Sequence, residues 1–296
     1  MSPRAVSIAA LGWAVALAPL AAFQWPTESN QIAATFGQSV LGVFHRGIDI
    51  AVSDAPVRPI EEGELVFCHE ESKARLRSLP SGLGSFAVIH HAQKTAMRSV
   101  YGYLLETESP PLSSRKLVGR DDVLSRGGGS GIAQNGRILL IIEDVAAGEL
   151  VNPLLVLPPV KDAVKPTIRN VELRQPGKAL AAADTFRLSE GSWELSAEIF
   201  DPSDAGKSAA GMAPYKVAVY VNGKETSQVV FDTLKESKGE LLVNPATEAR
   251  YSAIYREDGA MRLGAVQFNK GITNIEIVVR DYGGNERIYS HQFRVP

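Results

Sequence analysis

The stretch 44–52, FHRGIDIAV, decides how the first half of the chain is interpreted. It places His45 and Asp49 four positions apart, with Gly47 between them and apolar residues on both sides. An imidazole nitrogen and a carboxylate oxygen are suitable donors for zinc, and the glycine lets the backbone turn between them. A catalytic zinc centre needs three protein ligands and an open position for water. The stretch therefore predicts two metal ligands at the start of a strand, and a third must be sought elsewhere.

The composition indicates an ordinary globular protein with room for two domains. The chain has 296 residues, of which 45% are hydrophobic and 22% are charged, and its formal net charge is -2. This balance argues against a nucleic-acid partner, since such proteins normally carry a basic excess. The single cysteine, Cys68, excludes an intrachain disulfide. Short apolar runs separated by Gly, Pro and Ser turns predict an all-β fold.

The N-terminal residues 1–22 differ from the rest of the chain. Arg4 is followed by an apolar run and then by the small residues Ala21 and Ala22, a pattern typical of a secretory signal peptide. We therefore expect an exported protein, in the periplasm or the extracellular cell envelope, with no membrane span after cleavage. An uncleaved membrane anchor is the alternative.

Two domains are expected after the signal segment. Residues 23–158 form the first, residues 159–166 a proline-punctuated linker, and residues 167–296 the second. In the first domain, Glu62-Gly63 is expected to reverse a hairpin. In the second, Asn222-Gly223 and the run 283–285 predict hairpin turns, and Trp193 begins a run of alternating apolar residues. Roughly seven strands predict an immunoglobulin-like β-sandwich without cysteine pairs.

Several motifs of the first domain occur in one characteristic order: TFGQSVLGVFHRGIDIAV, APVRPIEEGELVF, GLGSFAVIHH, VYGYL, GGGSG, GRILLIIEDV and LVNPLLVLP. Over residues 33–157 the chain resembles the lysostaphin/LytM-type zinc endopeptidases, which have the duplicated hybrid motif fold and cleave the peptide cross-links of bacterial peptidoglycan. The resemblance implies an antiparallel β-sheet domain. It also implies that His45 and Asp49 correspond to the first two zinc ligands.

The remaining family motifs have lost their histidines. The Y-x-H motif reads Tyr101-Gly102-Tyr103, and the H-x-H motif, which supplies a catalytic histidine and the third ligand, falls in the apolar run 138–142 before Glu143. We therefore expect a degenerate member with no catalytic residues, in which His45 and Asp49 are a vestigial pair. His91, Tyr101 and Tyr103 are candidates for the former substrate groove. Cys68-His69 cannot rebuild the site with His91, because adjacent residues of a regular strand point to opposite faces.

These observations lead to one expected function and two alternatives. The expected function is an exported, inactive LytM-like protein that binds peptidoglycan or a cell-wall hydrolase, with no cofactor. The first alternative is an active metalloendopeptidase that holds zinc. The second is a structural adhesion protein of the envelope. No H-x-H sequence occurs anywhere in the chain, and this favours the inactive protein.

Overall fold

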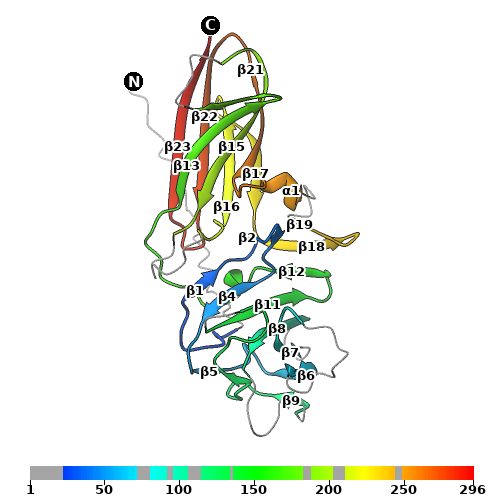
Figure 1. Cartoon of the computed structure of the whole chain (residues 1–296). Helices are drawn as coiled ribbons and strands as arrows, with labels where there is room; N and C mark the ends of the chain where they lie inside the picture. Colours follow the sequence, from blue (N-terminus) through cyan, green and yellow to red (C-terminus); the bar gives the residue numbers. More distant parts are fainter. Residues whose placement is uncertain are drawn as a thin grey trace, which may run out of the picture.

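The structure, a computed structural model, describes residues 23–71, 81–91, 96–105, 115–133, 136–182, 188–202, 211–243 and 249–296. The expected signal segment 1–22 lies outside these residues. The described chain is built almost wholly from antiparallel strands, in a lower sheet and an upper sandwich of long strands (Figure 1). The all-β fold predicted from the sequence, an antiparallel sheet followed by a β-sandwich, is confirmed.

The lower half is organised around one extended sheet with the order β20-β19-β18-β12-β11-β8-β7-β6-β9, to which β4 and β1 are added beside β11. Its strands from the first half of the chain are β1 (Ile32–Ala34), β4 (Ile48–Ala51), β6 (Gly63–His69), β7 (Ser85–His90), β8 (Met97–Leu104), β9 (Leu117–Val118), β11 (Arg137–Asp144) and β12 (Glu149–Val151). The apolar run that the sequence shows at 138–142 is thus a strand at the centre of the sheet, paired with β4 on one side and β8 on the other.

The sheet also takes strands from the second half of the chain. β18 (Thr233–Ser237), β19 (Glu240–Val243) and β20 (Ala249–Arg250) continue it beyond β12, with Leu150 opposite Leu234. In Figure 1 the yellow β18–β19 hairpin lies beside the green β12. The expected segment 167–296 therefore does not form the sandwich alone, because it also supplies one end of the lower sheet.

Two short ribbons flank the sheet. One joins β2 (Ser39–Val40) to β3 (Val43–Phe44), and the other joins β5 (Pro56–Val57) to β10 (Ser125–Arg126). The hairpin expected at Glu62-Gly63 is wrong, since β5 pairs with β10 and not with β6. Gly63 instead marks a close approach of strands: a Cβ atom there would lie 2.6 Å from the carbonyl oxygen of His90.

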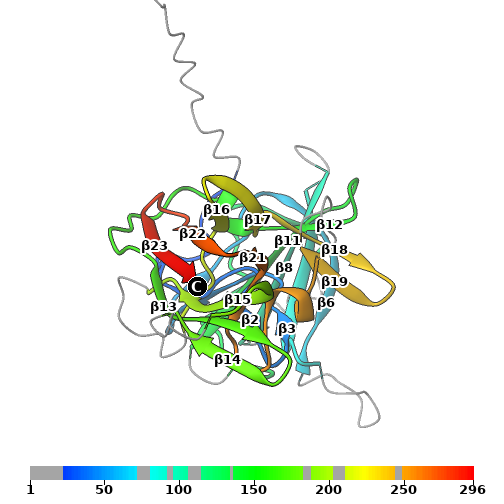
Figure 2. The same ribbon diagram turned by 90° about the horizontal axis from the view of Figure 1, so that it is seen from above.

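The upper half is a sandwich of two four-stranded sheets. One is β14-β13-β15-β21 and the other β17-β16-β22-β23, and Figure 2 shows β16, β17 and β22 on one side with β13, β14 and β15 on the other. Their bounds are β13 (Thr167–Gln175), β14 (Lys178–Ala181), β15 (Gly191–Phe200), β16 (Lys216–Val221), β17 (Lys224–Val230), β21 (Met261–Phe268), β22 (Gly271–Arg280) and β23 (Glu286–Val295).

Local sequence signals of the sandwich are confirmed. The alternating residues of β15 that the sequence places on one face are all buried in the sandwich core: Trp193, Leu195, Ala197 and Ile199. Asn222 and Gly223 both have positive φ, 51° and 79°, and make the two-residue turn between β16 and β17. Such a turn matches the right-handed twist of its strands.

The two halves share one core. Phe36 and Phe44 from the first half belong to the same buried cluster as Phe231 and most of the sandwich interior. Asn152, at the cap of the 3-10 turn η3 (Pro153–Leu155), donates through Nδ2 to the carbonyl oxygen of Phe231 at 2.7 Å and contacts the Tyr282 hydroxyl at 2.7 Å. A short helix, α1 (Tyr251–Ile254), packs on the same junction. Phe44 immediately precedes His45, so this junction positions the candidate site.

Candidate functional site

His45 and Asp49 meet as the sequence predicts. His45 follows β3 and Asp49 lies in β4, and the Nε2 atom of His45 is 3.2 Å from Asp49 Oδ1. The Nδ1 atom of His45 donates to the carbonyl oxygen of Thr35 at 3.1 Å, because a carbonyl can only accept. A backbone carbonyl on one ring nitrogen is the arrangement that commonly orients a metal-ligating histidine, with the other nitrogen facing the metal. The ring is therefore oriented as a ligand would be.

Gly47 allows the approach of β4 to β11. A Cβ atom at this position would lie 2.1 Å from the carbonyl oxygen of Leu140. The glycine is thus required by the closeness of two strands, and not only by the turn that the sequence indicates between the two ligands.

The second oxygen of Asp49 is taken by an arginine that the sequence does not place near it. Arg137, the first residue of β11, lies with Nη1 3.1 Å from Asp49 Oδ2. Asp49 is only 3% exposed, whereas the Arg137 side chain is 36% exposed. A buried carboxylate is costly unless it is paired, so the guanidinium provides the charge that Asp49 needs.

The strand register shows which side chains of β11 lie next to Asp49, where a third ligand would be required. Leu139 lies directly opposite Asp49 in the β4–β11 pair. Leu139 and Ile141 project to the same side as Asp49, since they alternate with Ile138 and Leu140 on the core face. Both are nearly buried and pack together with Tyr103 and Ala133. The two strand positions beside Asp49 are therefore apolar.

These residues do not fit a catalytic zinc centre. Such a centre needs three nitrogen, sulfur or oxygen ligands, and His45 and Asp49 supply two. Over the described part of the chain, the one group of three or more His, Cys, Asp or Glu side chains that could hold a metal lies elsewhere and does not include this pair. Asp49 also forms an ion pair with Arg137, whose positive charge opposes the binding of a second cation there.

The three groove candidates are separated by the structure. Tyr103 packs against Leu139 and Ile141 on the His45 and Asp49 side, whereas Tyr101 is fully buried in the core on the opposite face of the sheet. Residues two positions apart in a regular strand share a face, but β8 is irregular here. Tyr103 has a φ of 64°, and the β7–β8 register shifts beside it. Burial raises the pKa of the Tyr103 hydroxyl, the Asp49 carboxylate raises it further, and Arg137 lowers it.

His91, like Tyr101, lies in the core and not beside His45. Its Nδ1 donates to the carbonyl oxygen of Glu62 at 2.9 Å, and its Nε2 lies 2.8 Å from Ser99 Oγ. Ser99 in turn lies 3.1 Å from the Tyr101 hydroxyl, which accepts a hydrogen bond from the Ile60 N–H at 2.7 Å. Burial lowers the pKa of His91. Although a serine beside a histidine is typical of a nucleophile, both are fully buried, so this network is structural.

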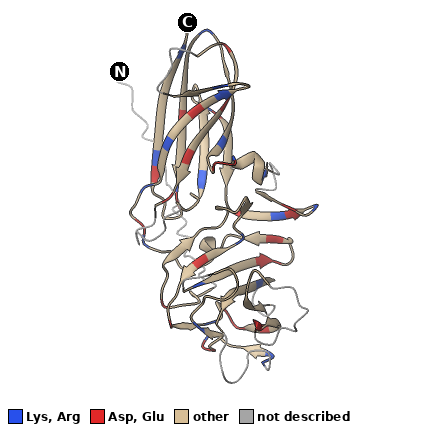
Figure 3. Cartoon of the chain, viewed as in Figure 1, with Lys and Arg blue, Asp and Glu red and all other residues tan. Residues whose placement is uncertain are grey.

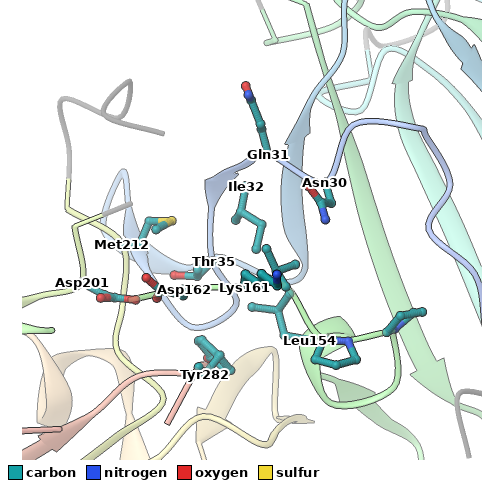
Figure 4. A pocket seen from close by; sticks show the side chains of 14 residues that line it. Asn30, Gln31, Ile32, Thr35, Leu154, Lys161, Asp162, Asp201, Met212 and Tyr282 are labelled. Atoms are coloured by element: carbon teal, nitrogen blue, oxygen red, sulfur yellow. The ribbon is translucent and has the colours of Figure 1, made fainter. Parts of the chain in front are cut away.

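A cavity of about 350 Å³ lies where the chain passes between the two halves. Its walls include Ile32, Leu154 and Met212, and Figure 4 shows Asp162 and Asp201 close together beside Thr35. Carboxylate oxygens of Asp162, Asp201 and Asp281 lie within 4.8 Å of one another, the group of acidic residues noted above. The sequence does not place these three residues together, since they lie far apart along the chain. Asp281 also accepts hydrogen bonds from the backbone and side chain of Asn285, as the expected turn at 283–285 requires.

Charged residues of both signs are spread over the described strands (Figure 3). Figure 3 shows Lys and Arg interspersed with Asp and Glu along the strands of both halves in this view, without a basic stripe. Among the described residues, no helix is long and apolar enough to cross a membrane.

Comparisons with known proteins give limited likeness. One protein-family model, which carries no descriptive name, matches residues 165–296. No curated protein matches the chain. Among solved structures, the chain is similar to a mutant catalytic domain of the prophage-encoded M23 protein EnpA from Enterococcus faecalis. The sequence identity is 19% and the TM-score is 0.31, and the match covers 41% of this chain and 87% of that chain. The function of the chain therefore has to be argued from its own residues.

Proposed function

We propose that the chain is an exported, non-catalytic LytM-like protein that binds peptidoglycan, or a hydrolase acting on it, in the bacterial cell envelope. The observation that carries the proposal is that other side chains already occupy the positions next to His45 and Asp49. Arg137 pairs with one Asp49 oxygen, and Leu139 occupies the strand position opposite. The sequence motifs around His45 support the envelope setting by their resemblance to enzymes of peptidoglycan.

The site lacks the groups that metal-assisted hydrolysis requires. Zinc in such a site activates water and polarises the scissile carbonyl, and a nearby base accepts the water proton. Here the neighbours of Asp49 on β11 are Leu139 and Ile141, and a tyrosine occupies the Y-x-H position at Tyr103. None of these side chains is a general base near neutral pH. Binding without cleavage is the role that such a face can support.

Two assays on the purified full-length chain test the proposal. In the first, the protein is sedimented with insoluble peptidoglycan; in the second, release of soluble peptide fragments is followed with and without added zinc. We expect co-sedimentation, no fragment release and no stoichiometric zinc. Cross-link cleavage that is lost in His45→Ala, together with bound zinc, would establish the active endopeptidase instead.

A hydrolase partner and an adhesion role predict different results. If the partner is a hydrolase, the chain changes the rate at which that enzyme digests peptidoglycan without cutting it alone. If neither peptidoglycan binding nor an effect on hydrolases is observed, the proposal is wrong and the structural adhesion protein is the better description.

A further inference from the structure

We infer that the exposed ring of Phe67, on the same sheet face as His45 and Asp49, is a stacking surface for a sugar ring of a polysaccharide. This deepens the proposed function and rests on it, because it names the glycan strand, and not the peptide, as the part of peptidoglycan that this face binds. The inference involves no metal and needs no chemistry at the His45 and Asp49 pair.

A row of apolar side chains crosses the sheet from the candidate site to β6. It runs through the neighbouring strands β11, β8, β7 and β6, and its members lie opposite one another in turn: Ile141, Val100, Val88 and Phe67. Ile141 and Val100 pack with Leu139, which lies opposite Asp49. Directly opposed residues of antiparallel strands share a face, so the ring of Phe67 belongs to the face that carries Asp49.

A β-bulge in β6 turns Phe67 onto this face. Leu65 pairs with Ile89, and Phe67 pairs with Val88, so β6 has one residue more than β7 between the two pairs. In a regular strand Phe67 would share a face with Leu65, which packs against the core. Bulges re-aim side chains in this way and are frequent next to functional sites.

The ring of Phe67 is held in place but is not covered. It stacks on the ring of Phe86, with the centroids 5.5 Å apart and the planes inclined by 27°, and the ring of His69 lies 5.6 Å from that of Phe86. Phe67 is nonetheless 53% exposed, and it belongs to none of the three buried clusters that the described residues form. Core packing therefore does not account for a phenylalanine at this position, and the side of the ring away from Phe86 is open to a ligand.

The surroundings of the ring favour a sugar over an apolar partner. The next row on the same face is polar, and its members also lie opposite one another in turn: Glu143, Arg98, His90 and Glu64. A pyranose ring offers C–H groups that stack on the negative face of an aromatic ring, and its hydroxyl groups need hydrogen-bond donors and acceptors around that ring. Phe67 supplies the first kind of contact, and the exposed Glu64 with His90 supplies the second. A wholly apolar partner would desolvate this charged row without giving it partners.

The test measures binding of a soluble oligomer of β-1,4-linked N-acetylglucosamine, which has sugar rings but no peptide, to the full-length chain by isothermal titration calorimetry. Phe67→Leu keeps an apolar side chain but removes the ring, so it should weaken binding by about fivefold or more. Phe67→Tyr retains the ring and should bind the oligomer as the native chain does. The control is Ile288→Ala on β23, where the native side chain is 56% exposed, and this variant should also bind as the native chain does.

Stability measurements separate a binding role from a structural one. Because Phe67 is half-exposed and lies outside the buried clusters, Phe67→Leu should leave the urea midpoint of unfolding unchanged. Loss of oligomer binding that occurs only together with a lowered midpoint would oppose the inference. If Phe67→Leu fails to fold, Phe67→Thr gives the same test with a residue that favours strands.

Failure of the inference differs from failure of the proposed function. If the oligomer does not bind the native chain, or binds Phe67→Leu equally well, the inference is wrong, whereas co-sedimentation with insoluble peptidoglycan would still support the proposed function. If the native chain self-associates and Phe67→Leu does not, the face is an interface between copies of this chain, and the inference is wrong. If the oligomer and peptidoglycan both fail to bind and no hydrolase is affected, the inference and the proposed function are both wrong.

Discussion

Replacing Arg137 by glutamine should destabilise the protein through Asp49, which it leaves buried and without its cationic partner. Breaking a fully buried ion pair by removing one member costs about 3–5 kcal/mol. Here the Arg137 side chain is 36% exposed while that of Asp49 is 4% exposed, so water screens part of the interaction. We therefore expect a loss of about 1–3 kcal/mol in the free energy of unfolding, measured by urea denaturation as a lower midpoint with an unchanged slope.

The chain contains a matched control for this experiment. Arg98 and Glu143 form an ion pair with the same 3.1 Å separation and the same 36% exposure of the arginine, but the Glu143 side chain is 31% exposed. Arg98→Gln should cost only about 0–1 kcal/mol, because both partners are open to solvent. The difference between the two arginine variants isolates the burial of Asp49.

A double-mutant cycle completes the argument. Asp49→Asn removes the buried charge. Arg137→Gln should therefore cost less in that background than in the native chain, by at least about 1 kcal/mol. If the two substitutions are additive to within about 0.5 kcal/mol, or if Arg98→Gln costs as much as Arg137→Gln, Arg137 does not compensate Asp49 and the reasoning is refuted.

Three further predictions concern the scaffold around the site. Gly47→Ala places a Cβ 2.1 Å from the Leu140 carbonyl oxygen, so thermal unfolding should show a loss of about 3 kcal/mol or more, and a melting temperature within a degree of the native one would contradict it. Burial lowers the pKa of His91, so the unfolded state takes up a proton at a higher pH than the folded state does. The stability that the neutral His91 contributes should be complete above about pH 6.5 and should fall as the pH drops below that value. In His91→Gln, the free energy of unfolding should depend less steeply on pH over this range. Asn152→Ala leaves the Phe231 carbonyl and the Tyr282 hydroxyl without its amide and should cost about 2–4 kcal/mol in urea unfolding, whereas a cost under about 0.5 kcal/mol would show that this junction is not held by the side chain.

Features with a local cause could be predicted from the sequence. The alternation that begins at Trp193 identifies a strand with one buried face, because side chains alternate along every strand. Asn222-Gly223 identifies its turn because few residue pairs accept two positive φ angles in succession. The spacing of His45, Gly47 and Asp49 likewise identifies a pair of neighbouring donors. Each of these depends on fewer than a dozen consecutive residues.

Features that depend on strand pairing could not be predicted in this way. Arg137 is separated from Asp49 by 88 positions, and only the β4–β11 register brings them together. The sequence places Tyr101 and Tyr103 on one face by regular alternation, and the irregularity of β8 puts them on opposite faces. Pairing of β18 with β12 crosses the expected domain boundary for the same reason. A basic residue directly before the apolar run at 138–142 is the one signal that could have suggested a charge partner for Asp49.

The backbone around His45 is held in place by contacts that do not involve a metal. The amide of Gly37 donates to the His45 carbonyl, and the His45 amide donates to the Gln38 carbonyl, both at 2.8 Å. Gly37 lies directly against the ring of Phe231, a Cβ there being 2.2 Å from the ring, and its carbonyl accepts from the Tyr255 hydroxyl at 3.1 Å. The loop that holds His45 is therefore also the contact between the lower sheet and the sandwich. The packing of the two halves therefore requires the shape of this loop whether or not a metal binds, and Arg137 compensates the charge of the buried carboxylate beside it.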